Sequence, residues 1–194
     1  GIGVGLYLMV QSGWWLLLIG VGGLLCTLLY PPLKYRALGD LVILLAYGFL
    51  PALGTSYVAL GELDWRVLWM AVPVGLLVDA ILHANNTRDM VTDARAGIKT
   101  MAMALGTKPS AILYGFEMLF PFVWIAACSI AGFMPIWTVI AFMTLPVAIA
   151  CAQTMKNSVE GGVEMIADLD VRTANLQLMF SLLLTVAFVA ARFL

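Results

Sequence analysis

The sequence predicts an all-α protein that crosses a membrane several times, and its composition and apolar runs carry that prediction. Of its 194 residues, 63% are hydrophobic and 11% are charged, whereas a soluble domain has roughly a quarter charged residues. The apolar residues form continuous runs close to the length of about 20 residues that a helix needs to cross the hydrocarbon core. A transmembrane β-barrel would instead show alternating segments of about ten residues. We therefore predict a polytopic helical bundle that forms a single domain over residues 1–194.

Six full spans are expected to follow a shorter apolar segment at the start of the chain. Residues 1–10 are too short to cross a membrane, and no basic region precedes them, so they do not resemble a signal peptide. They have the character of the end of a helix, which indicates an N-terminally truncated fragment. The full spans are expected at 13–29, 41–60, 66–84, 110–131, 135–153 and 175–193.

Glycine and proline residues are expected to mark the ends of these spans, because both disfavour the interior of a helix. Prolines within spans are tolerable where neighbouring helices satisfy the freed carbonyl groups. The expected breaks are Pro31-Pro32, Gly61, Pro109, Gly132 with Pro135, and Gly161-Gly162.

Basic residues gather on one side of the predicted bundle. If the spans alternate in direction, segments 30–40, 85–109 and 154–174 share a side and carry eight of the ten Lys and Arg residues. Cytoplasmic segments have an excess of Lys and Arg, so this side should face the cytoplasm. We predict an integral, multi-pass protein, in the plasma (inner) membrane if the source is prokaryotic. The net charge of −1 provides no basic surface for nucleic acid.

The polar segment at residues 83–100 is the strongest functional signal in the chain. Asn86, Asp89 and Asp93 have spacings of three and four residues, which place side chains on one face of a helix. Magnesium takes oxygen ligands, often one or two carboxylates together with substrate phosphates. Asp89 and Asp93, with Asn86 as a neutral ligand, therefore predict a Mg²⁺ site at the cytoplasmic boundary. Ordinary Asp–Arg pairs on a solvated face would have the same composition.

Extending this helix backwards places Asp79 and His83 on the same face and suggests other interpretations. A zinc site has less support, because His83 is the only histidine and no cysteine is near it. Asp79, His83 and Glu117 are also the residue types of a relay in a cation-coupled transporter. Such a transporter would need acids near the midplane and an internal repeat, and no repeat is visible. We expect Glu117 to pair structurally with a polar group on a neighbouring helix.

A second polar motif, Tyr30-Pro-Pro-Leu-Lys34-Tyr35-Arg36, lies at the end of the first span and on the same side. Lys34 and Arg36 can bind phosphate oxygens, and the two tyrosines can donate hydrogen bonds. An interfacial aromatic belt with basic residues on the cytoplasmic side has the same pattern.

Three cations lie close to the acids in the 83–100 segment, and they either neutralise phosphate charge or pair with Asp89 and Asp93. Arg88 directly precedes Asp89 and points elsewhere on a helix, so it is the weaker candidate. Lys99 follows Gly97 in an expected loop that can fold over the site. The third cation is Arg95. The later segment 157–172 is expected to be mainly solvated, with residues 168–175 leading into the last helix.

The stretch from Asn85 to Gly106, Asn-Asn-Thr-Arg-Asp-Met-Val-Thr-Asp-Ala-Arg-Ala-Gly-Ile-Lys-Thr-Met-Ala-Met-Ala-Leu-Gly, strongly resembles the second aspartate-rich motif of the UbiA superfamily of intramembrane prenyltransferases. Its Asn-Asn-x-Arg-Asp-x-x-x-Asp pattern is similar to the menaquinone-pathway branch, which includes 1,4-dihydroxy-2-naphthoate prenyltransferases. Tyr30 and Lys34 match the superfamily's Tyr-x-x-x-Lys motif, and Gly39-Asp40 also fits.

The resemblance implies a nine-helix fold around a lipid-accessible cavity, of which this chain would supply six full spans and a partial one. The implied reaction moves a polyprenyl group from an allylic diphosphate to an aromatic acceptor, 1,4-dihydroxy-2-naphthoate or a related ring. The partners are thus a prenyl diphosphate, the acceptor and membrane lipid. The first aspartate-rich motif of the family has no match here, so we expect it upstream of Gly1 and expect activity from the full-length protein. The sequence does not indicate the length of the prenyl group or the oligomeric state of the protein.

The resemblance also assigns roles to residues. The metal ligands implied are Asp89, Asp93 and Asn86, with Mg²⁺ bridging to the prenyl diphosphate. The residues implied to hold the diphosphate are Tyr30 and Lys34, with Asn86 nearby and help from Arg88 or Lys99. The residues implied to be catalytic are Asp89, Asp93, Lys34 and Tyr30.

Overall fold

The computed structural model describes residues 1–193, which form helices joined by short turns and contain no strand. The predicted all-α bundle is therefore confirmed. Six helical segments are long and apolar enough to cross a membrane, in agreement with the six expected spans. They cover Trp15–Lys34, Gly39–Leu60, Trp65–Arg88, Thr107–Ile130, Ile136–Gly161 and Val163–Phe193.

Several of these segments contain more than one helical element. The first half of the chain contains α1 (Ile2–Ser12), α2 (Trp15–Lys34), α3 (Gly39–Ile43), the π-helix η1 (Leu44–Phe49), α4 (Leu50–Leu60), the 3₁₀-helix η2 (Trp65–Val67) and α5 (Leu68–Arg88). The second half contains α6 (Met90–Arg95), α7 (Met101–Leu105), α8 (Thr107–Ile130), the 3₁₀-helix η3 (Ile136–Thr144), α9 (Leu145–Gly161), the 3₁₀-helix η4 (Val163–Ile166) and α10 (Leu169–Phe193).

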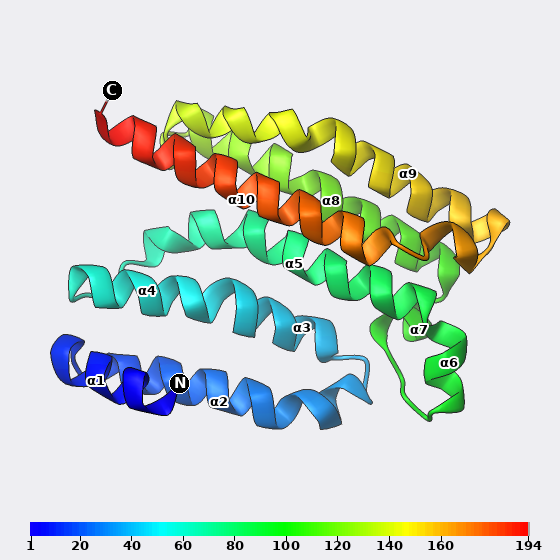
Figure 1. Ribbon diagram of the computed structural model, residues 1–194, viewed down its shortest axis with the longest axis horizontal. Coiled ribbons are helices and arrows are strands. Elements are labelled where there is room, and N and C mark those ends of the chain that lie inside the picture. The colour runs from blue at the N-terminus through cyan, green and yellow to red at the C-terminus, as the bar shows by residue number, and fades with distance from the viewer. Residues whose placement is uncertain (194) are drawn as a thin grey trace.

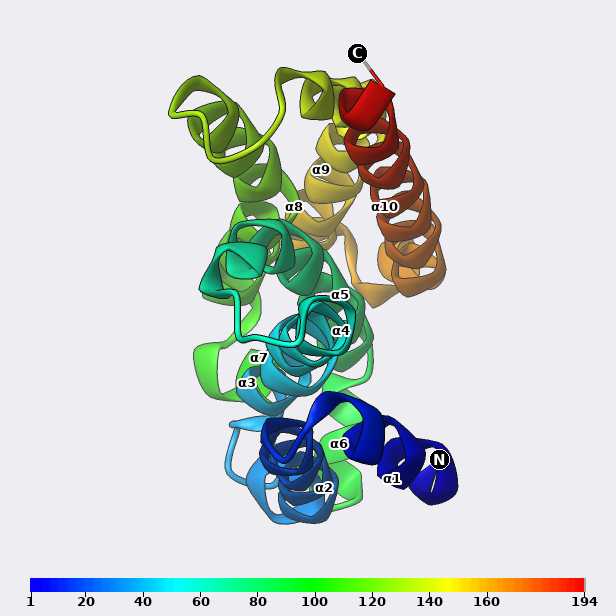
Figure 2. The same ribbon diagram turned by 90° about the vertical axis from the view of Figure 1, so that its left-hand side faces the viewer.

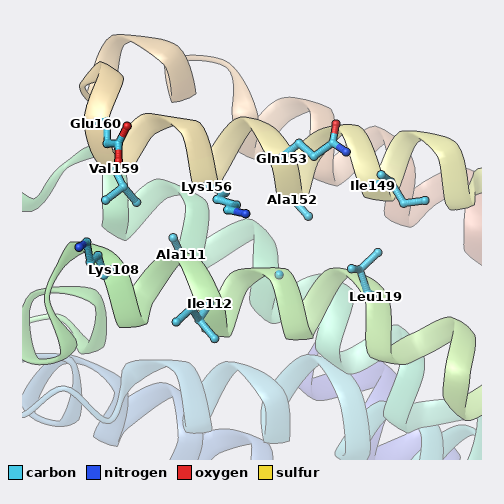
Figure 3. A pocket seen from close by; sticks show the side chains of 11 residues that line it. Lys108, Ala111, Ile112, Leu119, Ile149, Ala152, Gln153, Lys156, Val159 and Glu160 are labelled. Carbon is cyan, nitrogen blue, oxygen red and sulfur yellow. The ribbon is translucent and has the colours of Figure 1, made fainter.

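Helix α5 lies in the middle of the bundle (Figures 1 and 2). On one side it contacts η1, which continues directly from α3 into α4, and α2 and α1 lie beyond this segment (Figure 1). On the other side it contacts α8 and α10. Helices α8 and α9 lie next to each other and line a groove between them (Figure 3). The chain therefore divides into a packed group around α5, α8, α9 and α10 and an outer layer formed by α1 and α2.

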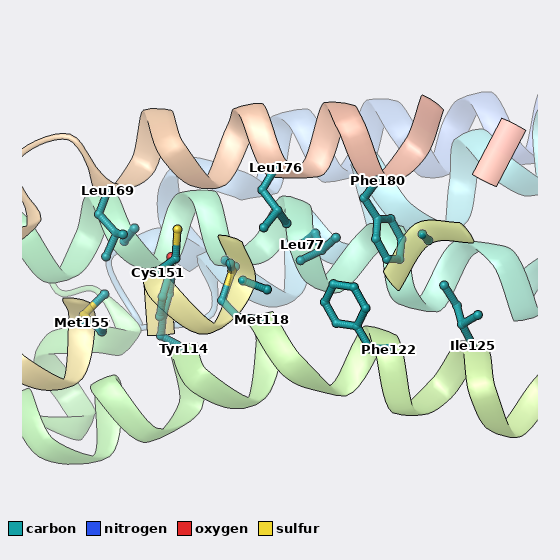
Figure 4. Packing of buried hydrophobic residues seen from close by; sticks show 14 of the residues in the cluster. Leu77, Tyr114, Met118, Phe122, Ile125, Cys151, Met155, Leu169, Leu176 and Phe180 are labelled. Carbon is teal, nitrogen blue, oxygen red and sulfur yellow. The ribbon is translucent and has the colours of Figure 1, made fainter. Parts of the chain in front are cut away.

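The packed group has a continuous apolar core (Figure 4). Phe122 on α8 meets Phe142 and Phe180 edge to face, with both pairs of ring centroids 5.5 Å apart. Tyr114 is fully buried and its hydroxyl lies 2.6 Å from the Thr173 hydroxyl of α10. Helix α2, in contrast, has no buried residue.

Two glycines allow η1 to pack closely on α5. A Cβ added at Gly48 would lie 3.1 Å from the Gly75 Cα, and one added at Gly75 would lie 2.8 Å from the Leu44 side chain. Small residues let helix backbones approach each other in membranes, where van der Waals packing drives association. This contact connects the segment Gly39–Leu60 to the packed group.

The observed helices differ from the predicted spans at Pro31-Pro32, which was expected to end the first span. Helix α2 continues to Lys34 with both prolines inside it. The fixed φ of proline is itself helical, and in a membrane helix neighbouring groups can satisfy the carbonyls that proline leaves without a donor.

Residues 157–172, which were expected to be mainly solvated, are mostly exposed, although they are helical over much of their length. Helix α9 extends to Gly161, η4 follows, and α10 already begins at Leu169. Ile166 and Leu169 are buried in the core, so apolar side chains hold this segment against the bundle.

Candidate functional site

The polar segments predicted to share a side do lie at one end of the bundle. The end of α2, the α6–α7 region and the start of α10 are on the right of Figure 1, and the chain's C-terminal end is on the left. Asp89 and Asp93 come to this end from the central α5 region, and Tyr30 and Lys34 come to it from the outer helix α2.

Asp89 and Asp93 remain one helical turn apart, although the continuous helix expected through both residues is interrupted. Helix α5 ends at Arg88 and a separate α6 begins at Met90, because Asp89 has a non-helical ψ of 8°. The Thr92 hydroxyl donates to the Asp89 carbonyl at 2.8 Å at this junction. The Asp93 N–H also bonds to the Asp89 carbonyl at 2.8 Å, so the i to i−4 pattern that spaces the carboxylates survives the break.

Arg88 forms a fork that joins α5 to α10. Its Nε and Nη2 donate to the two oxygens of Asp89 at 2.9 and 3.1 Å. Its Nη1 donates to Asp170 at 2.8 Å and to the Ala167 carbonyl at 3.2 Å. Bidentate, charge-assisted bonds of this kind fix both partners in orientation. Arg88, predicted as a diphosphate contact, thus has a protein partner on each side, and Asp170 is a contributor that the sequence prediction missed.

The predicted metal ligands fit Mg²⁺ as a partial set. Asn86 is buried, and its Oδ1 has no hydrogen-bond partner among residues 1–193. A buried acceptor without a partner is costly and rare, which is expected where a further ligand belongs. Within the described part of the chain no three His, Cys, Asp or Glu side chains are grouped closely enough to hold a metal. Two carboxylates and an amide are nevertheless sufficient for Mg²⁺ where substrate phosphates and water complete the shell.

The Tyr30–Lys34 motif is held next to the segment that carries Lys99. The Ala37 N–H donates to the Lys99 carbonyl at 3.2 Å, which connects the turn after α2 to the loop between α6 and α7. Asp40 and Asp93 both lie near enough to the Tyr30 hydroxyl for their charges to act on it. The structure therefore brings together residues from both motifs that the sequence analysis singled out.

Asp40 is a polar residue of this region that was not among the predicted site residues. It is buried, its Oδ1 has no partner among residues 1–193, and Lys34 and His83 lie within electrostatic range. Gly39 packs beside the end of α2, where a Cβ added to it would lie 3.5 Å from the Lys34 Cα, an ordinary contact distance. The sequence signal for Asp40 is the fit of Gly39-Asp40 to the superfamily pattern that follows Tyr30 and Lys34.

Deeper in the bundle, His83 is engaged through both ring nitrogens. Its Nδ1 lies 3.0 Å from Glu117 Oε1 and its Nε2 lies 2.7 Å from the Ser110 hydroxyl, both on α8. The Thr87 hydroxyl continues the network to Ser110 at 2.9 Å. The predicted structural pairing of Glu117 is confirmed, which favours a packing role for His83 over a cation relay. Asp79 lies within electrostatic range of Glu117, on the same face of α5 as His83.

Comparisons with known proteins agree with the motifs. Residues 1–162 match the UbiA prenyltransferase family. The chain is 36% identical over 176 residues to the UbiA prenyltransferase domain-containing protein 1 homolog of Drosophila melanogaster, an alignment that covers 89% of this chain and 47% of that protein. The human UbiA prenyltransferase domain-containing protein 1 is 34% identical over 174 residues, which cover 86% of this chain and 48% of that protein.

A bacterial relative has a more specific name. The 1,4-dihydroxy-2-naphthoate octaprenyltransferase of Bacillus subtilis (strain 168) is 27% identical over 166 residues, which cover 84% of this chain and 52% of that protein. The chain therefore spans about half the length of the curated relatives that it matches.

Proposed function

Because the chain belongs to the UbiA prenyltransferase family, we propose that the whole protein carrying it transfers a prenyl group from an allylic diphosphate to an aromatic acceptor. The observation that carries this proposal is the meeting of two motifs at one end of the bundle. Asn86, Asp89 and Asp93 supply oxygen ligands there, and Tyr30 and Lys34 supply hydrogen-bond donors. A cation-binding group and a phosphate-binding group are both needed where a diphosphate leaves.

Each group has a distinct task in this reaction. Asp89, Asp93 and Asn86 would hold Mg²⁺, which when bound would neutralise charge that develops on the diphosphate. Lys34 binds diphosphate oxygens as a point charge, and Tyr30 donates a hydrogen bond to them. Arg88 acts as a positioning residue, because its fork keeps the Asp89 carboxylate in place against α10.

The chemical step is a substitution at an allylic carbon. The C–O bond breaks with its electron pair leaving on the diphosphate, and an electron-rich ring carbon attacks the allylic cation. With 1,4-dihydroxy-2-naphthoate the new C–C bond forms at the ring, which regains its aromaticity by losing the carboxyl group as carbon dioxide and a proton. We propose this acceptor, and thus a role in menaquinone biosynthesis, on the naphthoate activity named for the Bacillus subtilis relative.

We further place the polar end at the cytoplasmic face of the membrane. Eight of the ten basic residues belong to segments at this end, in keeping with the positive-inside pattern. The aromatic acceptor and Mg²⁺ would then reach the site from the cytoplasm. The prenyl tail would extend into the hydrocarbon core.

The proposal is tested with the whole protein in membranes, radiolabelled prenyl diphosphate and 1,4-dihydroxy-2-naphthoate. We expect turnover that requires Mg²⁺ and stops with EDTA. We also expect turnover to fall about 100-fold in Asp93→Ala and in Asp89→Ala, because each variant removes a ligand of the Mg²⁺ that would neutralise the leaving diphosphate. Asp64→Ala, an acid removed at the opposite end of the bundle, is the matched control. Unchanged turnover in both site variants would overturn the metal assignment, and absence of prenyl transfer to any of a panel of aromatic acceptors would overturn the function.

A further inference from the structure

A groove of about 540 Å³ lies between α8 and α9, outside the site described above (Figure 3). Its walls are mainly apolar, and Ile112 on them is 74% exposed, with Leu119 and Ile149 exposed to a smaller extent. Lys108, Lys156, Gln153 and Glu160 are the polar residues that line it. The groove is therefore mainly apolar and contains both charged and uncharged polar residues.

The polar and apolar parts of the groove are ordered along the bundle axis. Lys108 lies at the start of α8, at the polar end of the bundle, and Leu119 lies eleven residues further along the same helix. At a rise of 1.5 Å per residue this separation is about 16 Å. That is close to half of the hydrocarbon thickness of about 30 Å, which is the depth of one leaflet. The groove thus matches one lipid leaflet in length, with its cations at the interface.

The charge at the interfacial end is complementary to an anion. Lys108 and Lys156 contribute two positive charges, Glu160 contributes one negative charge, and neither lysine is in a salt bridge among residues 1–193. A lysine near the membrane surface attracts anionic lipid, with about 1 kcal/mol for each basic residue.

The groove lies on a different face of α8 from the one that packs against α5 and the candidate prenyl-transfer site. Ser110 and Glu117 of α8 face α5, where they contact His83. At 100° per residue, Ile112 lies roughly 160° around the helix from Ser110, and so does Gly115 from Glu117. The groove is therefore on the opposite face of α8, and a ligand in it does not compete with a diphosphate at Asp89 and Asp93.

We propose that this groove binds one anionic phospholipid of the cytoplasmic leaflet. Its headgroup phosphate lies between Lys108 and Lys156, and one acyl chain lies along Ile112, Leu119 and Ile149. Gly115 leaves room for that chain, because a Cβ added there would meet no atom within 4 Å. A bulky side chain at this position fills the groove without disturbing the packed core.

The test is native mass spectrometry of the whole protein in a neutral detergent, titrated with phosphatidylglycerol or with phosphatidylcholine of the same acyl chains. We expect one tightly retained phosphatidylglycerol and a weaker phosphatidylcholine. The double variant Lys108→Gln/Lys156→Gln and the single variant Gly115→Leu should each lose about tenfold or more in phosphatidylglycerol affinity. The first variant removes charge alone and the second removes space alone.

Two matched control variants change residues outside the groove, one at the opposite end of the bundle and one on the outer helix α2. Arg66→Gln/Arg192→Gln removes two cations from the far end of the bundle, and Gly20→Leu adds the same side chain to a glycine on α2 that also has open space around it. Both should retain phosphatidylglycerol as the wild type does. Equal binding by the groove variants and the controls would overturn the proposal, as would equal affinity for the two lipids. A dimer that Gly115→Leu dissociates, with lipid binding unchanged, would instead assign the groove to a second copy of the chain.

Discussion

The segment containing α2 and the segment containing α5 are almost equally apolar, with mean hydropathies of 2.0 and 1.9, yet only one of them is packed into the bundle. No residue of α2 is buried among residues 1–193, whereas ten residues of α5 are buried. Hydropathy therefore detects both as spans but does not distinguish a central helix from an outer one.

Small and polar side chains make the difference. Gly75 lets α5 approach η1, and His83 bonds to two residues of α8. In lipid, helices associate through close packing and hydrogen bonds rather than through hydrophobic burial, because the lipid tails are as apolar as leucine. Helix α2 is rich in leucine, and a Cβ added at any of its glycines would approach no atom closer than 3.5 Å. Its Thr27 hydroxyl bonds within the helix itself. The difference teaches that the packed group should set the stability of this chain and that α2 should contribute mainly its polar end.

The largest expected effect is on stability in the packed group. Phe122→Ala removes a ring that is buried against Phe142 and Phe180, and the cavity should lower the free energy of unfolding by about 3 kcal/mol. Leu28→Ala on α2 is the matched control, because Leu28 is 62% exposed and its loss should change the free energy by less than about 0.5 kcal/mol. Denaturant unfolding of both variants in the same detergent measures the difference. Similar losses would contradict the division between the two regions.

A smaller effect is expected within the polar network of the packed group. Glu117→Leu leaves His83 Nδ1 without its partner at 3.0 Å in a buried position, and should lower the free energy of unfolding by about 2 kcal/mol. Glu117→Gln retains an oxygen acceptor and should lower it by less than about 1 kcal/mol. The two variants are compared in the same unfolding assay. If they were equally destabilised, the His83–Glu117 bond would not be what holds α5 and α8 together here.

Local periodicity was sufficient to predict much of this architecture. The spacing of Asp79, His83 and Asn86 placed them on one face of a helix, and all three are buried on α5. The pairing of Glu117 was also predicted, because an acid at membrane depth is costly without a partner. These features depend on residues within a few helical turns or on composition alone.

The features that were missed depend on contacts between distant segments. Arg88 meets Asp170 across 82 positions of sequence, and no local pattern distinguishes that acid from a solvated one. The interruption at Asp89 and the burial of Asp40 likewise follow from how α3, α5 and α10 meet. Residue spacing could therefore predict the site residues that belong to one motif. It could not predict those that join the site only through tertiary packing.

The smallest effect is expected for Lys34, where the outer helix contributes to the site. Lys34→Ala removes a point charge that would bind diphosphate oxygens, and should raise KM for the prenyl diphosphate about tenfold, in the range of a charge-assisted hydrogen bond. KM for the aromatic acceptor and the free energy of unfolding should remain close to wild type, because α2 has no buried residue. Lys34→Arg keeps the charge and should recover most of the affinity. Steady-state kinetics of the whole protein with each substrate varied in turn measures this. An effect confined to the acceptor would remove Lys34 from the diphosphate site, and a loss of stability comparable to that of Phe122→Ala would show that α2 belongs to the packed group after all.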